Sequence, residues 1–154
     1  MLRPGMPGST CIDTFSGTGA FGFEALSNGA AKVAMIDLET RDLILRNAAK
    51  LKVPREKYEL LSCDFELGLE KLSKKGFKAD FVFADPPYNR GFNTKLLKNR
   101  SLSDILNKDS VLVLESHMDE MAATAAVLDG WDVFKEKKYG DAFILLIRKG
   151  AANG

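Results

Sequence analysis

The stretch "DTFSGTGAFGFEAL" (residues 13–26) decides the fold of this chain. It places Gly17, Gly19 and Gly22 in the pattern G-x-G-x-x-G, directly after a short apolar run. Glycines in this pattern let the backbone turn tightly from a strand into a helix and approach a ligand at the helix N-terminus. A tight turn alone would also use them. The context favours a ligand site, because a strand precedes the pattern, a helix follows it, and the acidic Asp37 ends the next strand.

Outward from this stretch, predicted strands and helices alternate. The expected strands are 10–15, 32–37, 58–64, 80–85, 110–116 and two within 131–149, and the expected helices are 19–29, 40–51, 66–73, a broken 93–106, and 118–127. Alternation implies right-handed βαβ crossovers, and the hairpin-like last connection implies an antiparallel pair. We predict an α/β fold with a doubly wound, mostly parallel seven-stranded sheet, Rossmann-like, and an antiparallel C-terminal strand. Residues 1–9 are expected to be a loose lead-in to one domain, 10–149.

Three strands are apolar at every position, which locates the ligand crevice. The runs "FVFA" (81–84), "VLVL" (111–114) and "FILLI" (143–147) are typical of strands covered on both faces. In such sheets ligands bind outside the carboxyl ends of the strands. The residues that follow each strand are therefore the candidate site residues.

Composition sets the limits on function. The 154 residues suffice for about one domain, and 45% hydrophobic with 28% charged residues is ordinary for a globular protein. A net charge of +1 gives no strong global field toward nucleic acid or membrane. The two cysteines, Cys11 and Cys63, lie in or beside apolar runs and suit a reducing compartment. With no apolar run of membrane length, we expect a cytoplasmic protein.

The carboxylates at the ends of the first three strands distinguish between two cofactors. The glycine pattern fits a dinucleotide or S-adenosylmethionine. Asp13 lies under the glycine loop, where a carboxylate repels a pyrophosphate but attracts the ammonium group of a methionine moiety. Asp37 can accept from ribose hydroxyls. Asp64 can accept from an adenine amine, with Leu38 and Phe65 flanking the ring, or can cap the helix at 66–73; both roles are compatible.

The fourth strand ends in "DPPY" (85–88), an unusual sequence for a turn. Asp85 and the carbonyl of Pro86 are two acceptors held close together by a stiff backbone. They can hold both N–H groups of an exocyclic amine, while Tyr88 offers a ring on which a base stacks. A base must leave its helix to be gripped in this way. The alternative is a proline-rich turn with no further role.

The glycine stretch together with "DPPY" resembles the class I S-adenosylmethionine-dependent methyltransferases that act on amino groups. With "KYGDAFILLI" (138–147), residues 10–149 are similar to the bacterial family that methylates the N2 amine of one guanine in small-subunit (16S) ribosomal RNA. The resemblance implies S-adenosylmethionine as cofactor and ribosomal RNA or the small ribosomal subunit as partner. We also expect no membrane association, no metal and a monomer. The residues that it implies for the cofactor are Asp13, Phe15, Gly17 and Gly19 near the methionine part, Asp37 at the ribose, and Leu38, Asp64 and Phe65 at the adenine; those for the target amine are Asp85, Pro86, Pro87 and Tyr88.

Other functions remain open at this point. Adenine N6, cytosine N4 or a protein glutamine could replace guanine as the methyl acceptor. An NAD-dependent oxidoreductase shares the glycine pattern but leaves "DPPY" unexplained, and a non-catalytic RNA-binding module is a further alternative.

Contacts to RNA are the least specified part of the sequence. The family has a basic segment before the first strand, of which "LRP" (2–4) is a faint counterpart, so we expect weak binding to free RNA. The cations Arg90, Lys95, Lys98 and Arg100 could contact phosphates or form a solvated helix face, and Lys135, Lys137 and Lys138 could protect a strand edge. The single histidine, His117, is expected at a helix start or on the surface.

Overall fold

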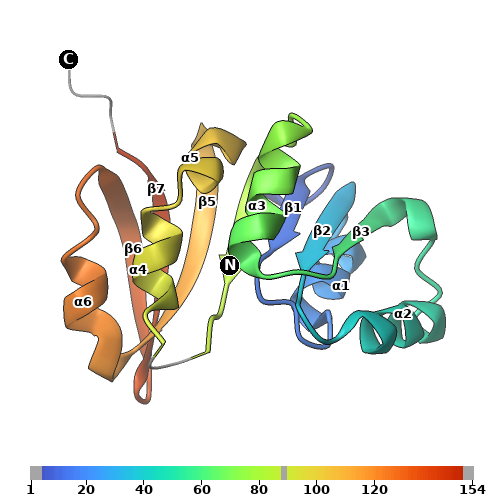
Figure 1. The fold of residues 1–154 in the computed structure, drawn as a ribbon, viewed down its shortest axis with the longest axis horizontal. Helices are drawn as coiled ribbons and strands as arrows, with labels where there is room; N and C mark the ends of the chain where they lie inside the picture. Colours follow the sequence, from blue (N-terminus) through green and yellow to red (C-terminus); the bar gives the residue numbers. More distant parts are fainter. Residues whose placement is uncertain (1–4, 88–89, 151–154) are drawn as a thin grey trace.

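The computed structural model describes residues 5–87 and 90–150, which form one seven-stranded sheet in the order β3-β2-β1-β4-β5-β7-β6 (Figure 1). The strands are β1 (Thr10–Asp13), β2 (Lys32–Ile36), β3 (Tyr58–Leu61), β4 (Ala79–Ala84), β5 (Leu106–His117), β6 (Trp131–Tyr139) and β7 (Ala142–Lys149). Neighbouring strands are parallel except that β7 is antiparallel to both β5 and β6. The predicted mostly parallel sheet with an antiparallel C-terminal strand is confirmed.

Helices cover both faces of the sheet. They are α1 (Ala20–Ser27), α2 (Arg41–Lys50), α3 (Phe65–Lys74), α4 (Phe92–Leu97), α5 (Arg100–Ile105) and α6 (Met121–Ala125), with short 3-10 helices η2 (Arg55–Lys57) and η3 (Met118–Glu120). In Figure 1, α3, α4 and α5 lie in front of the sheet and α1 lies behind it. The helix predicted as broken over 93–106 is the pair α4 and α5, separated where Asn99 caps α5 by accepting from the backbone N–H of Leu102.

Two apolar cores hold these layers together. The larger one packs α3, α4, α5 and α6 on one face and includes the fully buried Leu69, Leu96, Leu102 and Leu112. The smaller one packs α1 and α2 against β1–β3 on the other face. Gly22 permits the close approach of α1 to β2, because a Cβ there would lie 2.8 Å from the sulfur of Met35. The third glycine of the pattern therefore serves packing of helix on strand.

The two faces are not covered equally, which differs from the expectation for the apolar strands. Along β5, fully buried residues alternate with partly exposed ones such as Val111 and Val113. Phe83 on β4 and Ile144 on β7 are also partly exposed. The reason is that α1 and α2 pack over β1, β2 and β3, so within the described residues the α1 side of β4, β5 and β7 has no helix above it.

The described part of the lead-in packs against the domain and is not loose. Met6 is only 4% exposed and belongs to the smaller core. The backbone N–H of Gly8 donates to the carbonyl oxygen of Gly29 at 2.8 Å. Residues 5–9 are therefore held at the end of α1. The described helices include none that is both long enough and apolar enough to span a membrane.

Candidate active site

Acidic side chains gather where the parallel strands end. Asp13 ends β1, Asp37 follows β2, Asp64 lies three residues after β3, Asp85 follows β4, and Glu115 lies near the end of β5. Because these strands are parallel, their carboxyl ends share one edge of the sheet, the lower edge in Figure 1. The strand order reverses between β1 and β4, and this reversal is where open α/β sheets bind ligands.

The glycine loop between β1 and α1 has the backbone that its sequence predicts. Gly17 and Gly19 have φ values of +54° and +85°, in the left-handed region that favours glycine. A Cβ on Gly19 would also lie 2.7 Å from the ring of Phe23. The loop is fastened on its far side, because the backbone N–H of Ser16 donates to the carbonyl of Ile36 at 3.0 Å.

Asp13 is buried beneath this loop with part of its carboxylate unused. Its side chain is 1% exposed, and its Oδ2 atom has no hydrogen-bond partner. Burial, with smaller contributions from the nearby charges of Asp37 and Asp85, raises the pKa of Asp13 to about 7, although a hydrogen bond from the backbone of Phe15 lowers it. A buried acceptor without a donor is costly, so a cationic or N–H group placed here would be strongly favoured.

Asp37 has a different environment, because its carboxylate is already hydrogen-bonded to backbone. Oδ2 accepts from the N–H of Gly17 at 2.9 Å, and Oδ1 accepts from Glu39 at 2.9 Å and Thr40 at 3.1 Å. Burial raises its pKa, but these N–H donors outweigh burial and hold the pKa of Asp37 below its ordinary value. A carboxylate has about four acceptor positions, so room for a ribose hydroxyl remains after these three.

The residues expected around an adenine differ in how far their side chains are exposed to solvent. Asp64 caps α3 by accepting from the N–H of Leu67 at 2.9 Å, so the capping role is confirmed and only Oδ1 is used. Leu38, which follows Asp37 in the chain, is 65% exposed, so its side chain can contact a ligand. Phe65, in contrast, is 5% exposed, and its ring packs against Phe15 and Phe92 with centroids 5.1 and 5.6 Å apart. Phe65 can therefore support the site chiefly through this aromatic cluster.

The "DPPY" turn stands next to the glycine loop. Thr14 joins the two, because its backbone N–H and its hydroxyl both donate to the carbonyl of Phe83, at 3.0 and 2.9 Å. Beyond Phe83, Asp85 is exposed, Pro86 is buried and Pro87 is exposed. The side chain of Asp85 thus reaches solvent from a turn that Thr14 anchors to the glycine loop. Tyr88 lies outside the described residues.

Glu115 is a site residue that the sequence analysis missed. Ala84 pairs with Leu114, so Asp85 and Glu115 come next to each other on adjacent strands. Both line a cavity of about 60 Å³, together with Phe21 and Phe83. Burial raises the pKa of Glu115, and the neighbouring Asp85 raises it further. The signal was present, because "VLVLE" ends an apolar strand with an acid just as "FVFAD" does.

Asn93 in α4 was also missed. It is 3% exposed, and neither its amide nitrogen nor its amide oxygen has a hydrogen-bond partner. It follows Phe92, whose ring packs on Phe15 at 5.7 Å. A buried polar residue in the apolar segment "GFNTKLL" is the sequence signal that would have identified it.

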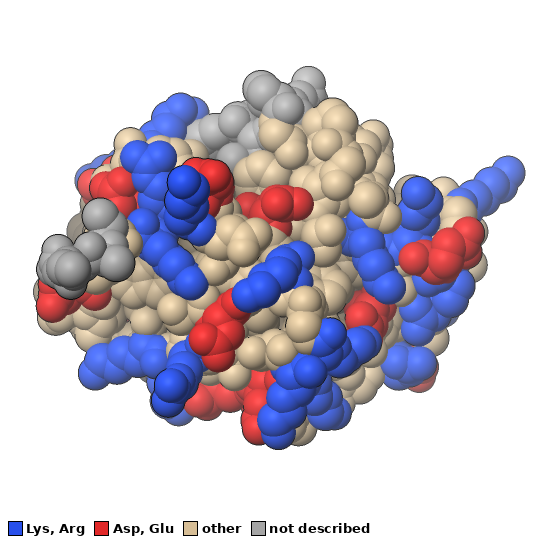
Figure 2. Space-filling view, turned by 90° about the horizontal axis from the view of Figure 1, so that it is seen from above, with Lys and Arg blue, Asp and Glu red and all other residues tan. Residues whose placement is uncertain are grey.

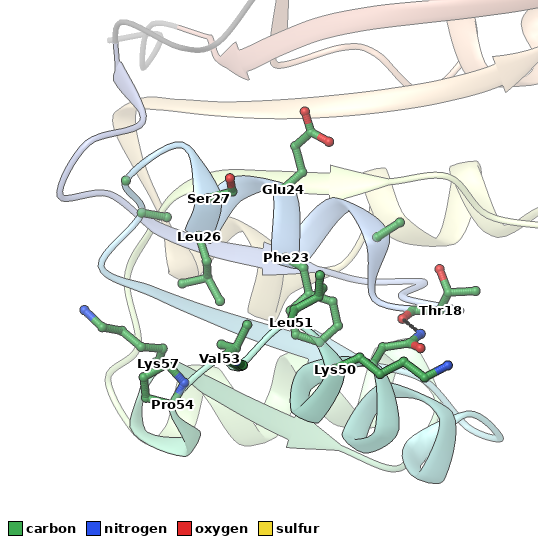
Figure 3. Close-up of a pocket in the computed structure, with 15 residues that line it drawn as sticks. Thr18, Phe23, Glu24, Leu26, Ser27, Lys50, Leu51, Val53, Pro54 and Lys57 are labelled. Carbon is green, nitrogen blue, oxygen red and sulfur yellow. Dashed lines mark hydrogen bonds between the residues drawn. The ribbon is translucent and has the colours of Figure 1, made fainter.

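A hollow lies between α1 and the end of α2. It is a pocket of about 840 Å³ lined by α1 and by residues between 47 and 57, and it includes none of the predicted site residues (Figure 3). The pocket reaches the glycine loop at Thr18, whose carbonyl accepts from the side-chain amide of Asn47 at 2.9 Å. The chemistry of the strand-end carboxylates, rather than the size of this hollow, identifies the site.

Surface charge is mixed. The cations considered for RNA contacts, Arg90, Lys95, Lys98, Arg100, Lys135, Lys137 and Lys138, are all exposed. Figure 2 looks down on the molecule from above, and blue and red side chains lie next to one another on that face. Within residues 5–87 and 90–150, no three His, Cys, Asp or Glu side chains are grouped to hold a metal ion. His117 begins η3, where its ring accepts from the N–H of Asp119, so its expected place at a helix start is confirmed.

Bacterial proteins are similar to most of this chain. Two proteins named ribosomal RNA small subunit methyltransferase D are similar to it. The protein from Haemophilus influenzae is 28% identical over 141 residues, covering 90% of this chain and 71% of its own length. The protein from Escherichia coli K12 is 26% identical over 152 residues, covering 97% of this chain and 73% of its own.

Solved structures agree with the fold. The structure of yhhF from Escherichia coli is 27% identical with a TM-score of 0.75, covering 97% of this chain and 80% of that one. SMU.776 in complex with SAH reaches a TM-score of 0.78 over 96% of this chain and 48% of its own, but at 15% identity it shows the fold alone. The family model described as "Conserved hypothetical protein 95" matches residues 1–148. The chain therefore belongs to the conserved hypothetical protein 95 family and is a Rossmann-like, S-adenosylmethionine-dependent methyltransferase.

Proposed function

We propose that this chain methylates the exocyclic N2 amine of a guanine in small-subunit ribosomal RNA, with S-adenosylmethionine as methyl donor. The single observation that carries the proposal is that Thr14 joins the glycine loop, where the cofactor would bind, to the turn that would hold the amine. Its two hydrogen bonds to the carbonyl of Phe83 hold the glycine loop of β1 against the turn that presents Asp85. The relatives named ribosomal RNA small subunit methyltransferase D support the choice of substrate.

The residues under the glycine loop fit the cofactor. The unpartnered Oδ2 of Asp13 suits the ammonium group of the methionine moiety, because that group supplies both charge and N–H donors. Asp37 would accept from a ribose hydroxyl, and the exposed Leu38 and the second carboxylate oxygen of Asp64 would contact the adenine. Phe15 lies beneath, where its ring supports the loop through Phe65. When bound, the cofactor supplies a sulfonium methyl group that an amine can attack.

The chain's own contribution is to position and polarise the amine. Asp85 and the carbonyl of Pro86 accept its two N–H groups, which turns the nitrogen lone pair out of the plane of the base. Pro86 is buried and its ring fixes φ, so the carbonyl direction is set before the base arrives. As the nitrogen forms its new bond it becomes cationic, and the bond to Asp85 strengthens. The nitrogen then loses one proton, to Asp85 or to water, and becomes a neutral secondary amine.

Further proposals follow from the substrate. Tyr88 would stack on the flipped base, and Pro87 would hold its ring at the turn. The exposed cations on α4, α5 and β6 would contact RNA phosphates. We propose that residues 10–149 act as one catalytic domain, as a monomer, without a metal and in the cytoplasm, where ribosomal RNA is assembled into subunits.

Methyl transfer to ribosomal particles tests the proposal. Small subunits from a strain lacking this gene would be incubated with the protein and methyl-labelled cofactor, and the modified nucleoside would be identified by mass spectrometry. We expect N2-methylguanosine at one position. Label in N6-methyladenosine or N4-methylcytidine would support the alternative amine acceptors, and label in protein would exclude an RNA substrate.

A further inference from the structure

Glu115 lies beside Asp85, where β5 and β4 end at the carboxyl edge of the sheet. Ala84 and Leu114 are partners in the parallel ladder, and the next residues, Asp85 and Glu115, face the same cavity. The two carboxyl groups lie close enough that Asp85 adds to the effect of burial in raising the pKa of Glu115.

The cavity that they line suits the edge of a base. Its walls are largely apolar, with Phe21, Phe83, Val113 and Ile144 around the two acids. Phe21 and Phe83 stack with centroids 5.9 Å apart and an angle of 10° between their rings. A volume of about 60 Å³ has room for only a few water-sized groups, so it admits the polar edge of a ring and not a whole base.

We propose that Glu115 is the residue that selects guanine, by accepting the N1–H of the base whose N2 amine is held by Asp85 and Pro86. This inference rests on the proposed function and deepens it. N1–H and the N2 amine are adjacent donors on one edge of guanine, and Asp85 and Glu115 are adjacent acceptors on neighbouring strands.

The same geometry rejects the other amine-bearing bases. Adenine and cytosine carry a ring nitrogen with a lone pair beside their amine, and an ionised carboxylate facing a lone pair is repelled and left without a donor. A site built to bond a substrate N–H discriminates strongly against an analogue that lacks it, because its own polar group then stays unpaired.

A guanine analogue without N1–H isolates this contact. 2-Aminopurine keeps the 2-amine that receives the methyl group but has a bare lone pair at N1. Small subunits would carry guanine or 2-aminopurine at the methylated position, introduced by splinted ligation of the ribosomal RNA. The kcat/KM ratio of guanine to 2-aminopurine would be measured for the wild type and for Glu115→Gln and Glu115→Ala. We expect the ratio to fall about 10–100-fold in both variants, the range for one charge-assisted hydrogen bond.

Two controls separate this contact from other effects. Asp85→Asn should lower both rates by similar factors and keep the ratio, because both substrates have the amine. Glu136→Gln, an exposed acid on β6, should change neither rate nor ratio. S-adenosylhomocysteine binding by each variant, read by thermal shift, reports that the site is folded.

The possible results distinguish a failure of this inference from a failure of the proposed function. If the wild type methylates guanine but the Glu115 variants keep the wild-type ratio, the inference fails and the proposed function stands. A wild-type ratio below about 3, far under the loss expected for this bond, overturns the inference without any variant. If the wild type does not methylate the guanine-containing subunits at all, the proposed function fails and this inference fails with it.

Discussion

The backbone N–H of Gly17 donates a hydrogen bond to Oδ2 of Asp37 at 2.9 Å, which fastens the glycine loop after β1 to the end of β2. The other oxygen of Asp37 accepts from the N–H groups of Glu39 and Thr40. One carboxylate therefore fixes two loops that border the cofactor site. Its role in shaping the site comes in addition to any contact with ribose.

Asp37→Ala should consequently weaken cofactor binding by about 1–3 kcal/mol, because three backbone donors lose their acceptor and a ribose contact is lost with them. Glu39→Ala is the matched control, since Glu39 contributes only its backbone N–H to this network. Calorimetric titration with S-adenosylhomocysteine measures both. Equal affinities of Asp37→Ala and the wild type would show that the carboxylate neither shapes nor contacts the site.

Asp13→Asn should stabilise the free protein at high pH. The pKa of Asp13 is raised from 3.8 to about 7, so the folded state holds a proton that the unfolded state releases. Stability therefore falls as pH rises from about 4 through 7, by an amount of order 4 kcal/mol. An amide at this position does not ionise. Urea unfolding at pH 5.5 and pH 8 should show that the free energy of unfolding of the variant, relative to that of the wild type, is higher at pH 8. A difference in unfolding free energy that does not change with pH would contradict the buried ionisation.

Cofactor affinity should depend on pH through the same residue. An ammonium group pairs with ionised Asp13, so binding must expel the proton that Asp13 carries below its pKa of about 7. Below that pH the affinity should fall by up to about tenfold per pH unit, and about half a proton should be released per site near pH 7. Calorimetry of S-adenosylhomocysteine binding in two buffers of different ionisation enthalpy measures this. Asp13→Asn should bind weakly at every pH, with no proton release.

Free RNA should bind weakly and with a shallow salt dependence. The net charge of the chain is only +1. Affinity for phosphates comes from the number of cations that reach the backbone. Replacing Lys95, Lys98 and Arg100 by glutamine should reduce the salt slope of filter binding by about 0.7 for each cation that contacts a single strand. A nanomolar midpoint at physiological salt would contradict this expectation.

The strand-end carboxylates could be predicted from sequence because each lies at the end of a predicted strand or within three residues of it. Asp13, Asp37, Asp64 and Asp85 were found in this way, and the parallel sheet brings their ends to one edge. Glu115 meets the same criterion, because it directly follows the apolar run "VLVL", but no motif surrounds it.

Other features could not be found from one sequence because they depend on tertiary contacts. The backbone partners of Asp37 come from residues 20 positions before it and two or three after it. Phe65 was expected to flank an adenine, but its ring is committed to Phe15 and Phe92. An apolar run such as "VLVL" shows that a strand can be covered on both faces, and only the position of α1 and α2 shows that one face is partly open.

The turnover of Asp85→Ala tests the central claim most directly. The account holds that Asp85 accepts from an amine that becomes cationic only as it is methylated, so its contact strengthens in the transition state. Labelled methyl transfer to small subunits, with S-adenosylhomocysteine affinity measured in parallel, should show turnover reduced about 100–1000-fold and cofactor affinity changed by no more than a few-fold. If Asp85→Ala keeps more than about a tenth of wild-type turnover, against the loss expected for such a contact, Asp85 does not hold the amine and "DPPY" is only a turn.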